Sequence, residues 1–159
     1  MANLEIERKF LVCGDFLNCV SSSSHIMQGY ICGTAGRTVR VRIRDDKAYL
    51  TIKGPAREGG FARFEWEKEI DVEDARELFS LCGGAFIDKT RCLVPSSDGR
   101  HTWEVDVFHG DNEGLVVAEI ELSSEDEPFE KPLWAGEEVT GDRRFYNSQL
   151  MINPYKNWK

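Results

Sequence analysis

RTVRVRIRDDKAYLTIK, residues 37–53, is the stretch that decides the fold. Valine and isoleucine alternate with arginine over residues 39–44, and apolar residues alternate with polar ones over 47–53. Successive side chains of a β-strand point to opposite faces, so this period of two predicts two strands, each with one apolar face. Asp45 and Asp46 between them are typical of a turn. The stretch therefore predicts an antiparallel pair of strands with a strongly basic face on the first.

The same alternation recurs along most of the chain. It predicts strands at residues 3–12, 26–32, 37–44, 47–53, 61–70, 86–94, 101–108 and 115–122. Helices are expected at residues 71–82, 124–131 and 143–152. Because short turns join most of the strands, the pattern favours an antiparallel sheet or barrel. The predicted class is α+β with a dominant sheet.

Length and composition limit the possible functions. The chain has 159 residues, of which 41% are hydrophobic and 30% charged, which predicts one globular domain over residues 1–159. The net charge of −8 argues against a general nucleic-acid or anionic-membrane surface. No apolar run approaches 18 residues, so we expect no membrane span. Five cysteines without a CxxC pair predict buried, reduced thiols in a cytoplasmic protein.

Like charges share one face of several strands. Glu5, Glu7 and Lys9 lie on the same face of the first strand, with neighbours ~7 Å apart. Two carboxylates at that distance repel by ~2 kcal/mol at an effective dielectric constant of about 20. The same spacing recurs in the pairs Glu104/Asp106 and Glu119/Glu121. Such repulsion is tolerable if something positive fills the space between the acids.

Two interpretations fit these faces. In the first, the sheet is half solvated and its charged face meets water. In the second, the strands close into a barrel whose charged faces turn inward, while helices cover the apolar outside. The inward acids would then bind a divalent metal such as Mg²⁺ or Mn²⁺, and the arginines and lysines would bind a polyanion. Side-by-side like charges favour the second interpretation.

Short motifs along the chain support the barrel. ExExK occurs as Glu5-Ile6-Glu7-Arg8-Lys9. It is followed, in order, by Gln28-Gly29-Tyr30, Arg40 with Arg42, Thr51-Ile52-Lys53-Gly54, Lys89-Thr90-Arg91, and residues 103–108, 118–121 and 136–142. Together these motifs resemble the CYTH superfamily, also called the triphosphate tunnel metalloenzymes. The resemblance runs from residue 3 to about residue 150 and is closest to the short bacterial inorganic triphosphatases.

The resemblance implies an eight-stranded antiparallel tunnel with a charged interior, a few helices packed outside, and Mg²⁺ or Mn²⁺ as cofactor. It implies metal-binding acids at Glu5, Glu7, Glu104, Asp106, Glu119 and Glu121. It implies substrate ligands at Lys9, Arg40, Arg42, Lys53 and Arg91, to which the face of the fifth strand adds Glu65 and Glu67. Tyr30 and Lys89 match a pair thought to activate the attacking water, and Glu7 is placed with them as catalytic. Arg44 is expected at the tunnel mouth, outside the core site.

The implied reaction is hydrolysis of triphosphate, with inorganic tripolyphosphate giving pyrophosphate and phosphate. Charge neutralisation and positioning suffice for such chemistry, and the sequence shows no Ser-His-Asp or Cys-His arrangement. Three alternatives stay open: a class IV-type adenylyl cyclase, a thiamine or nucleoside triphosphatase, and a non-catalytic binder of polyphosphate or nucleotide. The full set of acids favours an enzyme. The small-molecule substrate is the expected partner, in a monomer or a homodimer.

Overall fold

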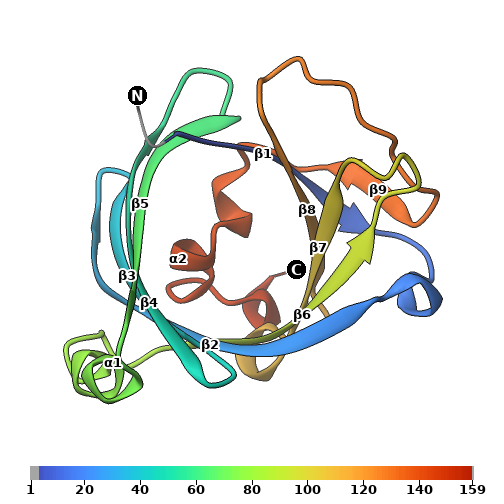
Figure 1. The fold of residues 1–159 in the computed structure, drawn as a ribbon. Coiled ribbons are helices and arrows are strands. Elements are labelled where there is room, and N and C mark those ends of the chain that lie inside the picture. Colours follow the sequence, from blue (N-terminus) through green and yellow to red (C-terminus); the bar gives the residue numbers. More distant parts are fainter. Residues whose placement is uncertain (1–3, 159) are drawn as a thin grey trace.

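The computed structural model describes residues 4–158, which form a closed antiparallel barrel (Figure 1). Its strands are β1 (Leu4–Val12), β2 (Ser22–Thr34), β3 (Arg37–Arg44), β4 (Lys47–Ala56), β5 (Ala62–Ile70), β6 (Ile87–Pro95), β7 (Thr102–Phe108), β8 (Val116–Leu122) and β9 (Ala135–Glu138). The helices are α1 (Val72–Phe79) and α2 (Asn147–Leu150), with short 3-10 turns η1 (Leu17–Cys19), η2 (Gly110–Asn112), η3 (Arg143–Phe145) and η4 (Tyr155–Asn157). Residue 3, where the first strand was expected to begin, lies outside the described residues.

The barrel closes because β1 pairs with β8 along one edge and with β5 along the first part of its other edge. The strand order is β5-β4-β3-β2-β6-β7-β8-β1, and an additional pairing joins β5 back to β1. Leu4 pairs with Phe64 of β5, whereas the stretch from Ile6 to Leu11 pairs with β8. The far end of β1 pairs with β9, a ninth strand that the sequence did not predict. The eight-stranded antiparallel barrel is therefore confirmed.

The apolar faces of the strands lie outside the barrel and form its main core. Phe10, Trp103 and Trp134 pack edge to face, with ring centres 5.7 and 5.5 Å apart. The segment that follows β8 covers this cluster without forming a helix in the described residues, so the predicted helix at 124–131 is wrong. Pro128 explains the difference, because a proline inside a helix lacks the N–H donor and clashes with the preceding turn.

The helices occupy two different places. α1 packs outside, where Ala75 is fully buried against Val41 and Ala48, as expected. The segment expected to be one helix at 143–152 is instead η3 followed by α2, and it enters one end of the barrel rather than packing outside (Figure 1). Its Phe145 and Leu150 are buried there. They pack in a cluster with apolar residues on the inward faces of the strands, namely Leu11, Ile87, Phe108 and Val117.

The structure bears on two expectations from composition, the state of the cysteines and the lack of a membrane span. All five cysteines are free thiols, but Cys13, Cys19 and Cys32 are exposed, so only Cys82 and Cys92 are buried as predicted. The exposed three lie outside the packed clusters, where nothing covers a small side chain. In residues 4–158 no helix has the length and apolar character needed to cross a membrane.

Candidate active site

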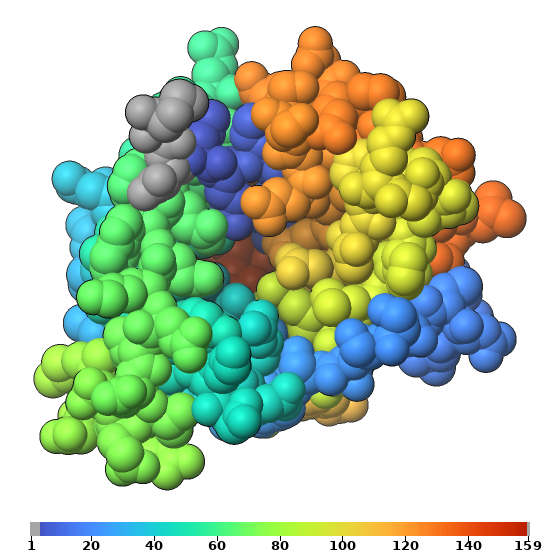
Figure 2. All heavy atoms as spheres, in the orientation of Figure 1, coloured from blue at the N-terminus to red at the C-terminus, as the bar shows by residue number. Residues whose placement is uncertain are grey.

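The inward faces of the strands enclose a cavity of about 210 Å³. Figure 2 shows a hollow at the centre of one face of the barrel, with atoms of the C-terminal segment at its floor. Eight of the chain's 20 basic residues line the cavity: Lys9, Arg40, Arg42, Arg44, Lys53, Arg63, Lys89 and Arg91. Seven of its 28 acidic residues do so: Glu5, Glu7, Glu65, Glu67, Glu104, Glu119 and Glu121. An acidic protein thus concentrates cations in its interior.

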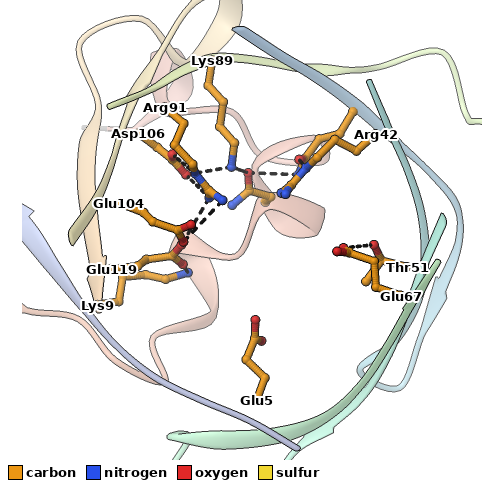
Figure 3. Close-up of polar contacts among 12 residues, drawn as sticks. Glu5, Lys9, Arg42, Thr51, Glu67, Lys89, Arg91, Glu104, Asp106 and Glu119 are labelled. Atoms are coloured by element: carbon orange, nitrogen blue, oxygen red, sulfur yellow. Dashed lines mark hydrogen bonds and ion pairs between the residues drawn. The ribbon is translucent and has the colours of Figure 1, made fainter. Parts of the chain in front are cut away.

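The structure brings the predicted site residues together with one exception. Tyr30 and every lysine, arginine and glutamate assigned from the sequence line this one cavity. Asp106 does not line it, because both of its oxygens are occupied in the wall. Oδ1 accepts from Arg91 Nε at 2.8 Å, and Oδ2 accepts from Lys89 Nζ at 2.8 Å and from Arg91 Nη2 at 2.9 Å (Figure 3). This arrangement favours Asp106 as the anchor of two cations over its predicted role as a metal ligand.

The cations of the basic wall lie close together and are largely buried. Burial, together with the nearby Arg40 and Arg91, lowers the pKa of Arg42 to about 9. Burial also lowers the pKa of Lys89 to about 7, against the attraction of Asp106. Both shifts mean that these cations lack enough negative charge around them. A bound anion would restore their ordinary ionisation.

At Glu7, on the acidic wall, negative charge is in excess. Burial, together with repulsion from Glu119 and Glu5, raises the pKa of Glu7 to about 8. Glu119 differs because, although burial opposes its ionisation, Lys9 at 3.3 Å and Arg91 at 3.5 Å outweigh burial and lower its pKa to about 2. Burial raises the pKa of Glu121 as well, aided by Glu5. The neighbouring lysines therefore do not supply enough positive charge to keep both Glu7 and Glu121 as readily ionised as ordinary glutamates.

A third set of polar side chains forms hydrogen bonds that link β3, β4 and β5. Thr51 donates to Glu67 Oε2 at 2.7 Å, and Arg40 Nη2 donates to the hydroxyl of Thr51 at 3.0 Å. Figure 3 shows Thr51 and Glu67 facing the cavity from one side and Glu5 from another. Arg40 is buried, and its Nε has no hydrogen-bond partner within the described part of the chain. A buried donor without an acceptor is unfavourable unless a ligand supplies one.

The donor set fits a hard divalent cation. Glu5, Glu7, Glu119 and Glu121 present carboxylate oxygens on the two paired strands β1 and β8, the ligands that Mg²⁺ and Mn²⁺ prefer. Across residues 4–158, however, no three Asp, Glu, His or Cys side chains gather at one point. A cation here would be held by one or two carboxylates, with water and ligand oxygens completing its coordination, as is usual for Mg²⁺.

Sequence reasoning missed part of the cavity wall. Arg44, which we expected outside the core site, lines the cavity, as the even-numbered face of β3 already indicated. The C-terminal segment contributes Tyr146, Asn147 and Ser148. The ring centre of Tyr146 lies 5.5 Å from Lys9 Nζ. Only the apolar residues at the ends of the charged strand faces hinted that something packs inside the barrel.

Comparison with known proteins agrees with this geometry. Residues 3–146 match the CYTH domain family, which is the family that the motifs resemble. The chain belongs to the CYTH domain family. Two relatives named inorganic triphosphatase match this CYTH domain. The protein from Acetivibrio thermocellus is 48% identical over 98% of this chain and 97% of its own length. The protein from Nitrosomonas europaea is 37% identical over 94% of this chain and 97% of its own length.

Solved structures share the fold. A crystal structure of an inorganic triphosphatase is 34% identical to this CYTH domain, covers 93% of this chain and 94% of its own, and superposes with a TM-score of 0.67. A protein from Hippeastrum, described as a putative adenylyl cyclase with a dominant triphosphatase activity, is 16% identical and has a TM-score of 0.59 over 76% of this chain and 80% of its own. The second likeness concerns the fold alone.

Proposed function

We propose that this CYTH domain hydrolyses triphosphate, with inorganic tripolyphosphate as the substrate. Water adds to the terminal phosphorus, the bond from that phosphorus to the bridging oxygen breaks, and pyrophosphate leaves, so that one pyrophosphate and one phosphate form. Two relatives that match nearly the whole chain carry the name inorganic triphosphatase. We further propose that residues 1–159 form a single domain, since the C-terminal segment packs into the barrel end.

The observation that carries the proposal is the unbalanced basic wall. Arg40 Nε is buried without a partner in the described residues, and the pKa of neighbouring Arg42 falls to about 9. Phosphate oxygens are the acceptors that guanidinium groups bind best, often with two parallel hydrogen bonds. The proposed ligands of the phosphate chain are Lys9, Arg40, Arg42, Lys53 and Arg91. These residues line the charged chamber inside the barrel, a cavity of about 210 Å³. It is smaller than the roughly 300–1,000 Å³ of drug-sized pockets and therefore suits a small inorganic anion.

A divalent cation, Mg²⁺ or Mn²⁺, is the proposed cofactor. Glu5, Glu7, Glu119 and Glu121 would hold it, with Glu104 nearby. When bound, such an ion neutralises phosphate charge and polarises the phosphoryl group. Burial, with repulsion from Glu119 and Glu5, raises the pKa of Glu7, and a cation held there would favour its ionised form.

Lys89 and Tyr30 are the proposed groups at the attacking water. With a pKa of about 7, Lys89 is partly neutral at neutral pH and exchanges a proton there readily. Lys89 Nζ and the Tyr30 hydroxyl do not bond to each other directly in residues 4–158; Gln28 and Asn147 connect them. We propose that this pair takes the proton of the water as it adds to phosphorus.

Phosphate release tests the proposal. Wild type is assayed with tripolyphosphate, ATP and pyrophosphate, each with Mg²⁺, with Mn²⁺ and with a chelator. We expect metal-dependent release from tripolyphosphate that is lost in Glu7→Ala and kept in the control Glu137→Ala, whose side chain is exposed on β9. Tight binding of tripolyphosphate without any release would contradict hydrolysis and favour a binding protein.

An adjoining cavity favours a second candidate, a nucleoside triphosphatase. This cavity of about 570 Å³ shares Tyr30, Arg63 and Tyr146 with the charged chamber, and its remaining lining is mostly apolar or small. Its volume lies within the range of organic ligand pockets. Faster release from ATP than from tripolyphosphate in the same assay would favour this second candidate.

A further inference from the structure

Gln28 is a fully buried polar residue whose amide makes three hydrogen bonds, one through its oxygen and two through its NH₂ group. Its Oε1 accepts from Arg42 Nε at 2.8 Å. Its Nε2 donates to the Tyr30 hydroxyl and to Asn147 Oδ1, both at 3.2 Å. Gln28 therefore touches a proposed phosphate ligand, a proposed catalytic residue and the C-terminal segment at once. A buried amide whose oxygen and both N–H groups are hydrogen-bonded holds one orientation, because flipping it would place donor against donor at Arg42 and leave Asn147 Oδ1 without its donor from Gln28.

Asn147 is the second member of this arrangement. As the first residue of α2, it directs its Oδ1 at Lys89 Nζ, 2.8 Å away, as well as at Gln28. Lys89 is 1% exposed, and its other acceptor is Asp106 Oδ2 at 2.8 Å (Figure 3). An ammonium group has three N–H donors. With two held by these oxygens in the described chain, the third position is directed by elimination toward the cavity that Lys89 lines, and in the neutral amine the lone pair occupies it.

The packing of α2 is what brings Asn147 to Lys89. The two residues are 58 positions apart, and α2 reaches the interior only because Leu150 and Phe145 are buried against Phe108 and Val117. A four-residue helix does not hold its own position in water. The contact between Asn147 and Lys89 therefore depends on apolar packing at one end of the barrel, although Lys89 itself lines the charged chamber.

We infer that Gln28 and Asn147 are positioning residues for the proposed hydrolysis: they orient Lys89, Tyr30 and Arg42 toward the reacting phosphate. The inference rests on the proposed function. Catalysis by positioning is sensitive to small displacements, and a shift of ~1 Å can lower a rate about 100-fold. Gln28 does not line the cavity, and the side-chain oxygen of Asn147, which does, is engaged by Lys89 and Gln28. We therefore expect their removal to lower kcat more than it weakens substrate binding.

The test compares kcat and KM for tripolyphosphate among variants of Asn147. Asn147→Ala removes the acceptor, and we expect kcat to fall at least tenfold while KM changes less than about threefold. Asn147→Asp keeps an oxygen at the same place and should restore kcat to within about threefold of wild type. Asn153→Ala is the matched control, because Asn153 is an exposed asparagine in the same segment, and it should leave both constants unchanged.

A second variant addresses the amide of Gln28. Gln28→Glu keeps the shape and the acceptor for Arg42 but loses both donations, so kcat should fall. In the double variant with Asn147→Ala, the loss should be smaller than the product of the single losses, because both act on the same groups. Thermal unfolding of each variant separates a loss of kcat from a loss of folded protein.

The outcomes distinguish this inference from the proposed function. If wild type releases no phosphate from tripolyphosphate or ATP, the proposed function and the inference both fail. If wild type is active and Asn147→Ala keeps kcat within twofold, the inference alone is overturned. It is also overturned if Asn147→Asp is as slow as Asn147→Ala, or if the loss appears only in KM.

Discussion

Lys53 Nζ lies 2.8 Å from Glu5 Oε1, although β5 separates their strands in the barrel. The side chains are 15% and 10% exposed, so the ion pair is largely shielded from water. It crosses the place where β5 closes against β1. Lys53 also lies 3.5 Å from Glu65 Oε2. One lysine thus neutralises acids from two strands at the closing edge of the barrel.

Removing the cation alone should destabilise the protein. Lys53→Met leaves Glu5 nearly buried without its closest partner, and we expect the free energy of unfolding to fall on the order of 3 kcal/mol. The double variant Lys53→Met with Glu5→Gln should regain most of this loss, yet remain inactive, because both positions belong to the proposed site. Urea unfolding and phosphate release measure the two effects. A double variant no more stable than Lys53→Met would show that the two residues are not coupled.

Glu7 should make stability depend on pH. Its pKa is about 8 in the folded protein, against an ordinary value of 4.5, so between these values the folded state binds a proton that the unfolded state releases. Stability contributed by this group is therefore present below pH 4.5 and is lost as pH rises to about 8. With chelator present, the Tm of wild type should fall across this window.

Glu7→Gln tests that dependence directly. Because Gln does not ionise, the fall in Tm between pH 5 and pH 8.5 should be smaller in this variant, while Glu137→Gln keeps the wild-type fall. Activity should be lost in Glu7→Gln, since the proposed metal ligand is gone. If Tm falls equally with pH in wild type and Glu7→Gln, the assigned environment of Glu7 is contradicted.

Arg40 should be more than a positive charge. Arg40→Lys keeps the charge but loses the planar group whose Nε is free for a phosphate oxygen in the described structure. We expect kcat/KM for tripolyphosphate to fall on the order of tenfold or more, and Arg40→Ala to lose more. The control is Arg57→Lys, at an exposed arginine of the loop after β4, and it should leave kcat/KM unchanged. Full activity in Arg40→Lys would reduce the role of Arg40 to electrostatics.

The external core should carry much of the stability. Trp103 is 1% exposed and packs edge to face against Phe10, Phe129 and Trp134. Trp103→Ala leaves a large cavity, and we expect it to lower the free energy of unfolding by about 3–5 kcal/mol. Leu133→Ala, at a fully exposed side chain, should change it by less than about 0.5 kcal/mol. Chemical denaturation of both variants measures the contrast, and similar losses would contradict it.

Local pattern predicted most of the strands and the residues that face the cavity. Arg40 and Arg42, or Glu119 and Glu121, are two positions apart on one strand and therefore share a face wherever the strand lies. The helix predicted at 124–131 failed because helical content was assigned across Pro128. α2 was placed outside because nothing local shows that Phe145 and Leu150 meet the inward residues Phe108 and Val117.

The sequence by itself determined that these strands have one apolar and one charged face, because alternation is a property of neighbouring residues. The tertiary structure alone decided which charges meet. The pairing of Lys53 with Glu5 joins residues 48 positions apart, and that of Lys89 with Asn147 joins residues 58 apart. Neither distance is set by a local period. They follow from barrel closure between β5 and β1 and from the burial of α2 in the barrel end, which depend on the packing of the whole chain.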